Sequence, residues 1–166
     1  MSAGVRAFVA LGSNLGDSRA LLTTARQRLA ELSYGPLLCS SFWRTSPEDC
    51  PPGSPDFLNA VVAFQVSPEH TPESLLAALQ AIEREAGRQP KKTENEPRPL
   101  DLDLLAFGAE IRQTPTLTLP HPRAHQRRFV LAPLAELAPD LVLPGQALTV
   151  SQLLARLPEG GCRRED

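Results

Sequence analysis

The order of periodic segments along the chain is the feature that most restricts its fold. Apolar runs and strict alternation predict strands, whereas apolar residues that recur every three or four positions predict helices. By these signals we expect strands near residues 5–11, 36–45, 57–66 and 100–107, with one helix after the first strand and another after the third. This order is typical of the ferredoxin-like split βαβ arrangement. We therefore expect an α+β fold with a ferredoxin-like βαββαβ core, in which helices pack on an antiparallel sheet.

Capping signals mark both predicted helices. Asp17 or Ser18 can cap the first, whose apolar positions are Leu22, Ala25, Leu29 and Leu32. Thr71 can cap the second, with Pro72 at its first position. Beyond Gly108 we expect a small C-terminal hairpin, a basic loop and short helices that end near Leu157. Because no linker or internal repeat interrupts the sequence, we expect residues 1–166 to form a single domain.

Composition and charge restrict the function classes. The 166 residues carry a net charge of −2, which gives no electrostatic footprint for nucleic acid. Three cysteines, Cys39, Cys50 and Cys162, form no CxxC pair, which favours a reduced intracellular protein without structural zinc. The apolar run at residues 5–11 is too short for a signal peptide, and no run approaches transmembrane length. We expect a cytoplasmic protein, a monomer or weak homodimer, with no nucleic-acid or membrane partner.

Two acids stand inside an otherwise apolar strand in the stretch RPLDLDLLAFG, residues 98–108. Burying a carboxylate is costly unless it is paired or binds a metal. Residues two apart on a strand share a face, so Asp101 and Asp103 point together, while the leucines around them point to the other side. Such a pair suits Mg²⁺, which takes carboxylates together with substrate phosphates, and could bridge two metal ions. The alternative is a solvent-facing strand edge with two acids that bind nothing.

Basic residues on both sides of the acids favour a phosphate ligand. Arg98 lies just before them, and a later segment concentrates His121, Arg123, His125, Arg127 and Arg128. Guanidinium groups match phosphate geometry, and carboxylates, a metal and arginines together make a phosphoryl-transfer site. A solvated basic loop is the alternative. His121 and His125 could also bind zinc, but no HExxH pattern supports that interpretation.

Polar side chains also occur in the third strand and the second helix. Asn59 interrupts an apolar strand, with Phe57 two residues before it on the same face. The amide could read the edge of a heterocycle on which Phe57 stacks, or it could be an ordinary buried amide. Gln80 and Glu83 lie three apart on one face of the second helix, where such pairs commonly face solvent.

Taken in order, several segments resemble one known family. They are LGSNLGD, SSFWRTSP, PDFLNAVV, IEREAGR, PRPLDLDLLAFG and LPHPRAHQRRFVLAPLAELAP, and they run from about residue 11 to residue 139. The chain resembles the bacterial 6-hydroxymethyl-7,8-dihydropterin pyrophosphokinases of folate biosynthesis. The resemblance implies a ferredoxin-like fold and transfer of the β,γ-pyrophosphoryl group of ATP to the hydroxymethyl oxygen of the dihydropterin, with release of AMP.

The resemblance also implies roles for individual residues. Asp101 and Asp103 would hold two Mg²⁺ ions that bind the phosphates of ATP. The other catalytic positions are Arg98, His121 and Arg88. The pterin would stack between two aromatic rings and be held at its edge; these positions are Phe57, Phe129, Thr45, Ser46, Asn59 and Asn14. The nucleotide positions are Gln80, Glu83, Arg88, Arg98, Leu104, His121 and Arg127. The loops 46–55 and 88–97 correspond to lids that close over the nucleotide.

The chain departs from the family pattern mainly in the second lid. Pro90 and Asn95 stand where some members have an arginine and a tryptophan, and Thr116 replaces a nucleotide-site arginine. These changes concern lid closure and leave the metal pair and the pterin residues intact; Lys91 or Lys92 could compensate. The alternatives are a pterin- or nucleotide-binding module without catalysis, a structural or regulatory ferredoxin-like domain, and a different metal-dependent phosphotransferase.

Overall fold

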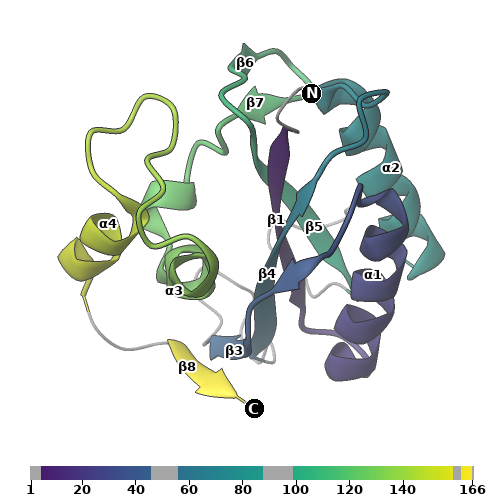
Figure 1. The fold of residues 1–166 in the computed structure, drawn as a ribbon. Coiled ribbons are helices and arrows are strands. Elements are labelled where there is room, and N and C mark those ends of the chain that lie inside the picture. The colour runs from purple at the N-terminus through teal and green to yellow at the C-terminus, as the bar shows by residue number, and fades with distance from the viewer. Residues whose placement is uncertain (1–4, 46–55, 88–98, 159–161, 166) are drawn as a thin grey trace.

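The structure is a computed structural model that describes residues 5–45, 56–87, 99–158 and 162–165 (Figure 1). The strands are β1 Arg6–Ser13, β2 Leu38–Cys39, β3 Phe42–Thr45, β4 Phe57–Gln65, β5 Asp101–Phe107, β6 Arg112–Gln113, β7 Thr118–Leu119 and β8 Cys162–Glu165. The helices are α1 Ser18–Leu32, α2 Pro72–Glu85, α3 Arg128–Leu137 and α4 Val150–Arg156, with a 3₁₀ turn, η1, at Ala124–Gln126. Among the described helices, none is long and apolar enough to cross a membrane.

The main sheet has the strand order of a ferredoxin-like core. Its path is β5-β1-β4-β3-β8, its described pairings are antiparallel, and β2 also pairs with β4. β1 and β4 are therefore central, and β5 forms one edge. The helices α1 and α2 follow β1 and β4, as the sequence predicts, which confirms the α+β core. The hairpin β6-β7 forms a separate two-stranded sheet, also as expected.

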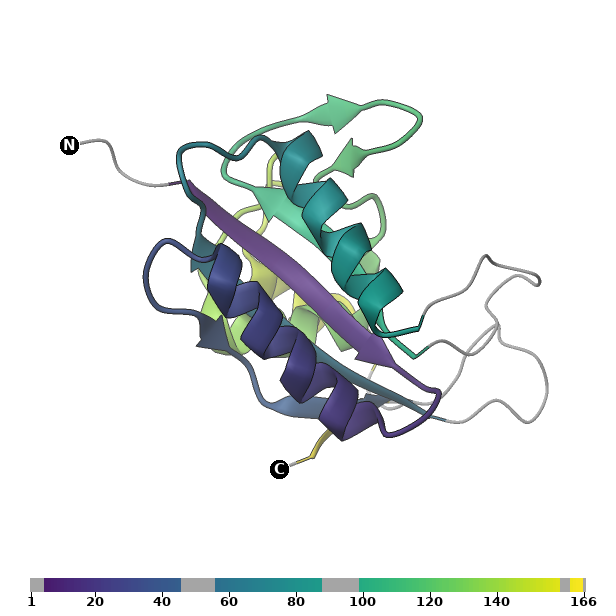
Figure 2. The same cartoon turned by 90° about the vertical axis from the view of Figure 1, so that its right-hand side faces the viewer.

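Helices cover both faces of the sheet. Figure 1 places α1 and α2 on one side and α3 and α4 on the other, and Figure 2 shows α1 and α2 in front of β1. The alternation of β4 explains this arrangement, because its two faces enter two different apolar clusters. Val61 and Ala63 pack with α3 and α4. The residues that pack with α1 and α2 are Leu58, Ala60, Val62, Phe64 and Val66. A strand that is apolar on both faces is stable only when both faces are removed from water.

The segment 36–45 is not the single strand that the sequence predicts. β2 and β3 are separated by Ser40 and Ser41, and the Ser40 hydroxyl accepts a hydrogen bond from the Val61 amide at 2.9 Å. The hydroxyl thereby replaces a backbone acceptor in the ladder. The Ser40 carbonyl accepts instead from Arg26 Nη2 of α1, at 2.7 Å. A side chain that competes with the backbone for a ladder hydrogen bond interrupts the strand.

No sequence signal marks β8, because its residues CRRE show no apolar alternation. The strand pairs with β3 and is held there by side chains on both faces. On one face Arg44 Nη2 donates to Glu165 Oε1 at 2.9 Å, and on the other Arg164 Nε donates to Ser41 Oγ at 3.0 Å. Tertiary partners therefore decide the conformation of this segment rather than its own pattern.

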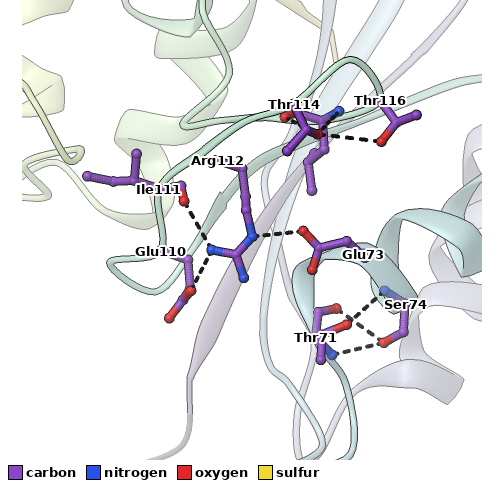
Figure 3. A network of polar contacts seen from close by, with 9 residues as sticks. Thr71, Glu73, Ser74, Glu110, Ile111, Arg112, Thr114 and Thr116 are labelled. Carbon is purple, nitrogen blue, oxygen red and sulfur yellow. Dashed lines mark hydrogen bonds and ion pairs between the residues drawn. The ribbon is translucent and has the colours of Figure 1, made fainter.

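The start of α2 is fixed in two ways. Thr71 and Ser74 form a capping box, with Ser74 N donating to Thr71 Oγ1 at 3.0 Å and Thr71 N donating to Ser74 Oγ at 2.9 Å (Figure 3). Arg112 of β6 binds Glu73 at 2.7 Å and Glu110 at 2.8 Å in the same view. The cap predicted at Thr71 is confirmed, and the ion pair holds the hairpin against α2.

The apolar stripe of α2 predicts a graded response to truncation. Leu79→Ala is expected to lower the free energy of unfolding by about 2–5 kcal/mol, because its side chain is fully buried. Leu76 is only partly buried on the same helix, so Leu76→Ala should cost clearly less. Urea denaturation followed by far-UV circular dichroism measures both values. Equal losses in the two variants would contradict the assigned core face.

Candidate active site

β5 places its two acids on the sheet face that α3 and α4 cover. Asp101 and Asp103 are half-buried, whereas Leu100, Leu102 and Leu104 are buried in the core beneath α1 and α2. The shared face predicted from the alternation is therefore present. The acids lie at the N-terminal end of β5, which is the same end of the sheet as the C-terminal end of β1.

A row of paired residues crosses the sheet at this level. Gly12 of β1 pairs with Asp101 on one side and with Asn59 of β4 on the other, and Asn59 pairs with Trp43 of β3. Residues paired across strands share a face, and adjacent strands lie about 4.8 Å apart, so Asp101 and Asn59 are roughly 10 Å apart across Gly12. A Cβ atom at Gly12 would lie 3.0 Å from Asn59 Oδ1, so only glycine leaves the amide its present position.

A second row lies one step nearer the end of the sheet. Thr45 of β3 pairs with Phe57 of β4 on one side and with Cys162 of β8 on the other. Asn59 Nδ2 donates to Thr45 Oγ1 at 2.7 Å, and Thr45 Oγ1 in turn donates to Cys162 Sγ at 3.7 Å. Burial raises the pKa of the Cys162 thiol above its usual range, so it stays protonated at neutral pH. The two rows together form a floor with an amide, a hydroxyl and an aromatic ring.

The basic segment before α3 lies on the same side of the sheet as this floor. Phe129, in the first turn of α3, is half-buried, and the Arg127 guanidinium lies 5.3 Å from the centre of its ring. Burial lowers the pKa of His121, and the nearby Arg127 charge lowers it further, while Asp101 opposes the shift. His121 is therefore a neutral imidazole at pH 7. Asp101 and Arg127 both lie close enough to the His121 imidazole to influence its pKa.

The two carboxylates fit a hard cation. Mg²⁺ is commonly bound by one or two carboxylates, with water and phosphate oxygens as its other ligands. In the described part of the chain, no three His, Cys, Asp or Glu side chains gather as metal ligands. His121 Nδ1 already accepts a hydrogen bond from Arg123 N at 3.2 Å. The zinc alternative at His121 and His125 therefore gains no support.

Glu83 and Gln80 lie beyond the outer edge of β5. Glu83 is buried, and its Oε2 accepts a hydrogen bond from the Leu102 amide at 2.8 Å, whereas Gln80 is exposed on α2. The Leu102 amide therefore points away from β1, and the Leu104 amide, two residues on, points the same way. The Leu104 side chain is buried in the core, so only its main chain is presented at this edge.

Other site predictions have different outcomes. Asn14, just after β1, is buried at the same end of the sheet. Ser46, Arg88 and Arg98 lie outside the described residues, as do both lid loops with Pro90 and Asn95. The sequence reasoning missed Gly12; a glycine inside a strand is the signal that could have marked a close approach there. It also missed the pairing of Cys162 with Thr45, for which no signal exists.

The Glu83 contact predicts a measurable loss of stability. Glu83→Ala is expected to lower the free energy of unfolding by about 1–3 kcal/mol, because the Leu102 amide loses its buried acceptor. Glu83→Gln keeps an oxygen acceptor and should lose less. Urea denaturation compares the two variants, and an equal loss in both would show that the hydrogen bond is not the cause.

Curated relatives resemble the chain along most of its length. Residues 8–139 match the family model of 7,8-dihydro-6-hydroxymethylpterin-pyrophosphokinase (HPPK). The 2-amino-4-hydroxy-6-hydroxymethyldihydropteridine pyrophosphokinase of Haemophilus influenzae is 42% identical over 145 residues, covering 87% of this chain and 88% of the relative. The enzyme of the same name from Pseudomonas aeruginosa is 41% identical over 159 residues and covers 96% of each chain.

Solved structures share the fold at low sequence identity. Wild-type Plasmodium falciparum HPPK-DHPS with pteroate has a TM-score of 0.72 and 15% identity, covering 93% of this chain and 42% of that one. An HPPK-DHPS in complex with substrates has a TM-score of 0.68 and 13% identity, covering 92% and 43%. This chain thus spans less than half the length of those proteins. The family match and the two relatives above 40% identity establish that the chain belongs to the 7,8-dihydro-6-hydroxymethylpterin-pyrophosphokinase family.

Proposed function

We propose that this chain transfers the β,γ-pyrophosphoryl group of ATP to the hydroxymethyl oxygen of 6-hydroxymethyl-7,8-dihydropterin, with release of AMP. The observation that carries the proposal is the row Asp101, Gly12 and Asn59, in a chain of the pyrophosphokinase family. It sets the acidic pair and the Asn59 amide on one sheet face, about 10 Å apart across Gly12. In the reaction, the hydroxymethyl oxygen bonds to the β-phosphorus, the bond from that phosphorus to the α,β-bridging oxygen breaks, and the hydroxyl proton is released.

The pterin is proposed to lie over the second row, between Phe57 and Phe129. Asn59 donates one N–H to Thr45, and its second N–H and its Oδ1 are proposed to pair with an acceptor and a donor of the heterocycle edge. Thr45 accepts from Asn59 and donates to Cys162, so its remaining lone pair can accept from an N–H of the ring. Backbone groups at Ser46 and the Asn14 side chain complete the proposed contacts.

Asp101 and Asp103 are proposed to hold Mg²⁺, two ions in all, together with the phosphates of ATP. Bound there, Mg²⁺ would neutralise charge on the transferred group and polarise the attacking hydroxyl. The protein contributes the fixed, half-buried positions of the two carboxylates on one edge strand. Arg88 and Arg98 are proposed as further cations of this region.

The nucleotide is proposed to lie along the outer edge of β5. The Leu104 amide points to this side, so its main chain can bind a base although its side chain is buried. Gln80 and Glu83 line the same edge from α2. Because His121 accepts a hydrogen bond at Nδ1, its proton is assigned to Nε2, and a neutral imidazole can then donate to a phosphate oxygen. Arg127 adds a permanent positive charge nearby.

The composition and charge of the chain also bear on its assembly and location. We retain the expectation of a monomer or weak homodimer in the cytoplasm that acts on small molecules and binds no nucleic acid or membrane. Every residue that the proposed reaction uses belongs to one chain. The other components of the reaction are the two substrates and the metal.

The metal pair is tested by isosteric substitution. With ATP, Mg²⁺ and the dihydropterin, the wild type should form AMP, which chromatography quantifies. Asp101→Asn and Asp103→Asn should each lower kcat by about 100-fold or more, because each removes a charged ligand that compensates charge in the transition state. Asp140→Asn, at an exposed position after α3, is the control and should keep the wild-type rate. Unchanged rates in both site variants would refute the metal assignment, and no AMP from the wild type would refute the activity.

The close approach at Gly12 gives a second test. Gly12→Ala should raise the KM for the pterin about tenfold, because a Cβ atom 3.0 Å from Asn59 Oδ1 forces the amide to move. If that displacement is the cause, Gly12→Ala should add little when it is introduced into Asn59→Ala. An additive effect of the two substitutions would instead place the cause elsewhere in β1.

A further inference from the structure

Glu136, near the C-terminal end of α3, receives several donors from the start of β3. Its carboxylate accepts from Trp43 Nε1 at 2.6 Å, from Ser41 Oγ at 3.0 Å and from Ser41 N at 3.2 Å. Arg164 Nη2 of β8 lies 3.8 Å away. Hydrogen bonds to an ionised acceptor are among the stronger ones in proteins. The proposed reaction assigns no role to any of these four residues.

These contacts connect the two elements that bear opposite sides of the proposed pterin pocket. Trp43 pairs with Asn59 across the sheet, and Thr45 lies two residues farther along β3 on the same face. Phe129 precedes Glu136 by seven residues, which is about two helical turns, so both lie on one face of α3. Glu136 therefore ties the helix that carries Phe129 to the strand that carries Thr45.

Stacking on both sides of a flat ring demands a well-defined gap. A radial gap of about 0.5–1 Å already forfeits a quarter to a half of the dispersion attraction between two groups. The apolar cluster beneath α3 keeps the helix on the sheet, but apolar burial is non-directional and does not by itself fix how far a helix slides. Hydrogen bonds are directional. In α3, Arg128 donates to the carbonyls of Leu157 and Pro158 after α4, whereas the contacts of Glu136 fix the helix relative to β3.

We propose that Glu136 is a positioning residue for the pterin pocket, which acts through Trp43 and Ser41 to fix the place of Phe129 relative to β3 and β4. This inference rests on the proposed function, because it requires that the pterin lie between Phe57 and Phe129.

The chain offers a matched control on the opposite face of the same strands. Glu165 of β8 binds Arg44 of β3, and its side chain is 32% exposed, close to the 24% of Glu136. Removing Glu165 therefore breaks an ion pair of similar exposure on β3 without touching α3. Glu165→Ala therefore shows the effect of loosening this sheet edge alone, against which the effect of displacing α3 can be compared.

The experiment compares Glu136→Ala, Glu136→Gln and Glu165→Ala by AMP-release kinetics. Glu136→Ala should raise the KM for the pterin about tenfold, since misplaced contacts weaken binding, and leave the KM for ATP within about twofold. Glu136→Gln should restore much of the loss, because its amide oxygen still accepts from Trp43. Glu165→Ala should leave both constants near wild type. Trp43 is the only tryptophan of the chain, so its emission should shift to the red in Glu136→Ala alone.

Defined results overturn the inference. One is an unchanged KM for the pterin in folded Glu136→Ala. Another is an equal rise of this KM in Glu165→Ala. A third is a parallel rise of the KM values for the pterin and for ATP in Glu136→Ala. Should Glu136→Ala fail to fold, Trp43→Phe removes the donor but keeps an aromatic ring. Trp43→Phe must then raise the KM for the pterin and leave the KM for ATP unchanged. If it does not, the inference is overturned. A wild type that forms no AMP refutes the proposed function instead, so the two failures are distinguishable.

Discussion

The register of β1 with its two neighbours is the constraint on which the site depends. Gly12 stands between Asp101 and Asn59, so the spacing of backbone hydrogen bonds sets the distance from the acidic pair to the amide. A slip of β5 by one residue would turn both acids into the core beneath α1 and α2 and bring three buried leucines to the other face. Burial of the leucines on one face of β5 therefore fixes the carboxylates on its opposite face.

The helices on the two faces of the sheet cover different kinds of residues. α1 and α2 close the larger apolar cluster and hold the sheet, whereas α3 covers only the apolar part of the opposite face, around Val61 and Ala63. The polar rows lie nearer the end of the sheet, where Phe129 and His121 approach from the segment that starts α3. The proposed metal ligands and the Asn59 amide are thus held by strands, while α3 covers one side of the proposed pterin site. β5 therefore holds the acids against the core, and the proposed width of the pterin pocket depends on the side-chain contacts of α3.

Local patterns in the sequence predict much of this arrangement, and pairings between distant segments account for the remainder. Alternation assigns the shared face of Asp101 and Asp103, and capping residues predict the start of α2 at Thr71. The break at Ser40 depends on a hydroxyl that competes for a ladder hydrogen bond with β4, and β8 consists of polar residues whose conformation is decided by β3. The importance of Gly12 appears only when both neighbouring strands are known. Roles for Ser46, Arg88 and Arg98 came from family resemblance, and these residues lie outside the described ranges.

A crystal structure of the complex with Mg²⁺, a non-hydrolysable ATP analogue and the dihydropterin would locate the metal ions and the pterin together. We predict metal ions about 2.0–2.1 Å from carboxylate oxygens of Asp101 and Asp103, with the pterin edge on Asn59 and its ring against Phe129. Metal bound by other residues, or a pterin bound on the face that α1 and α2 cover, would contradict it.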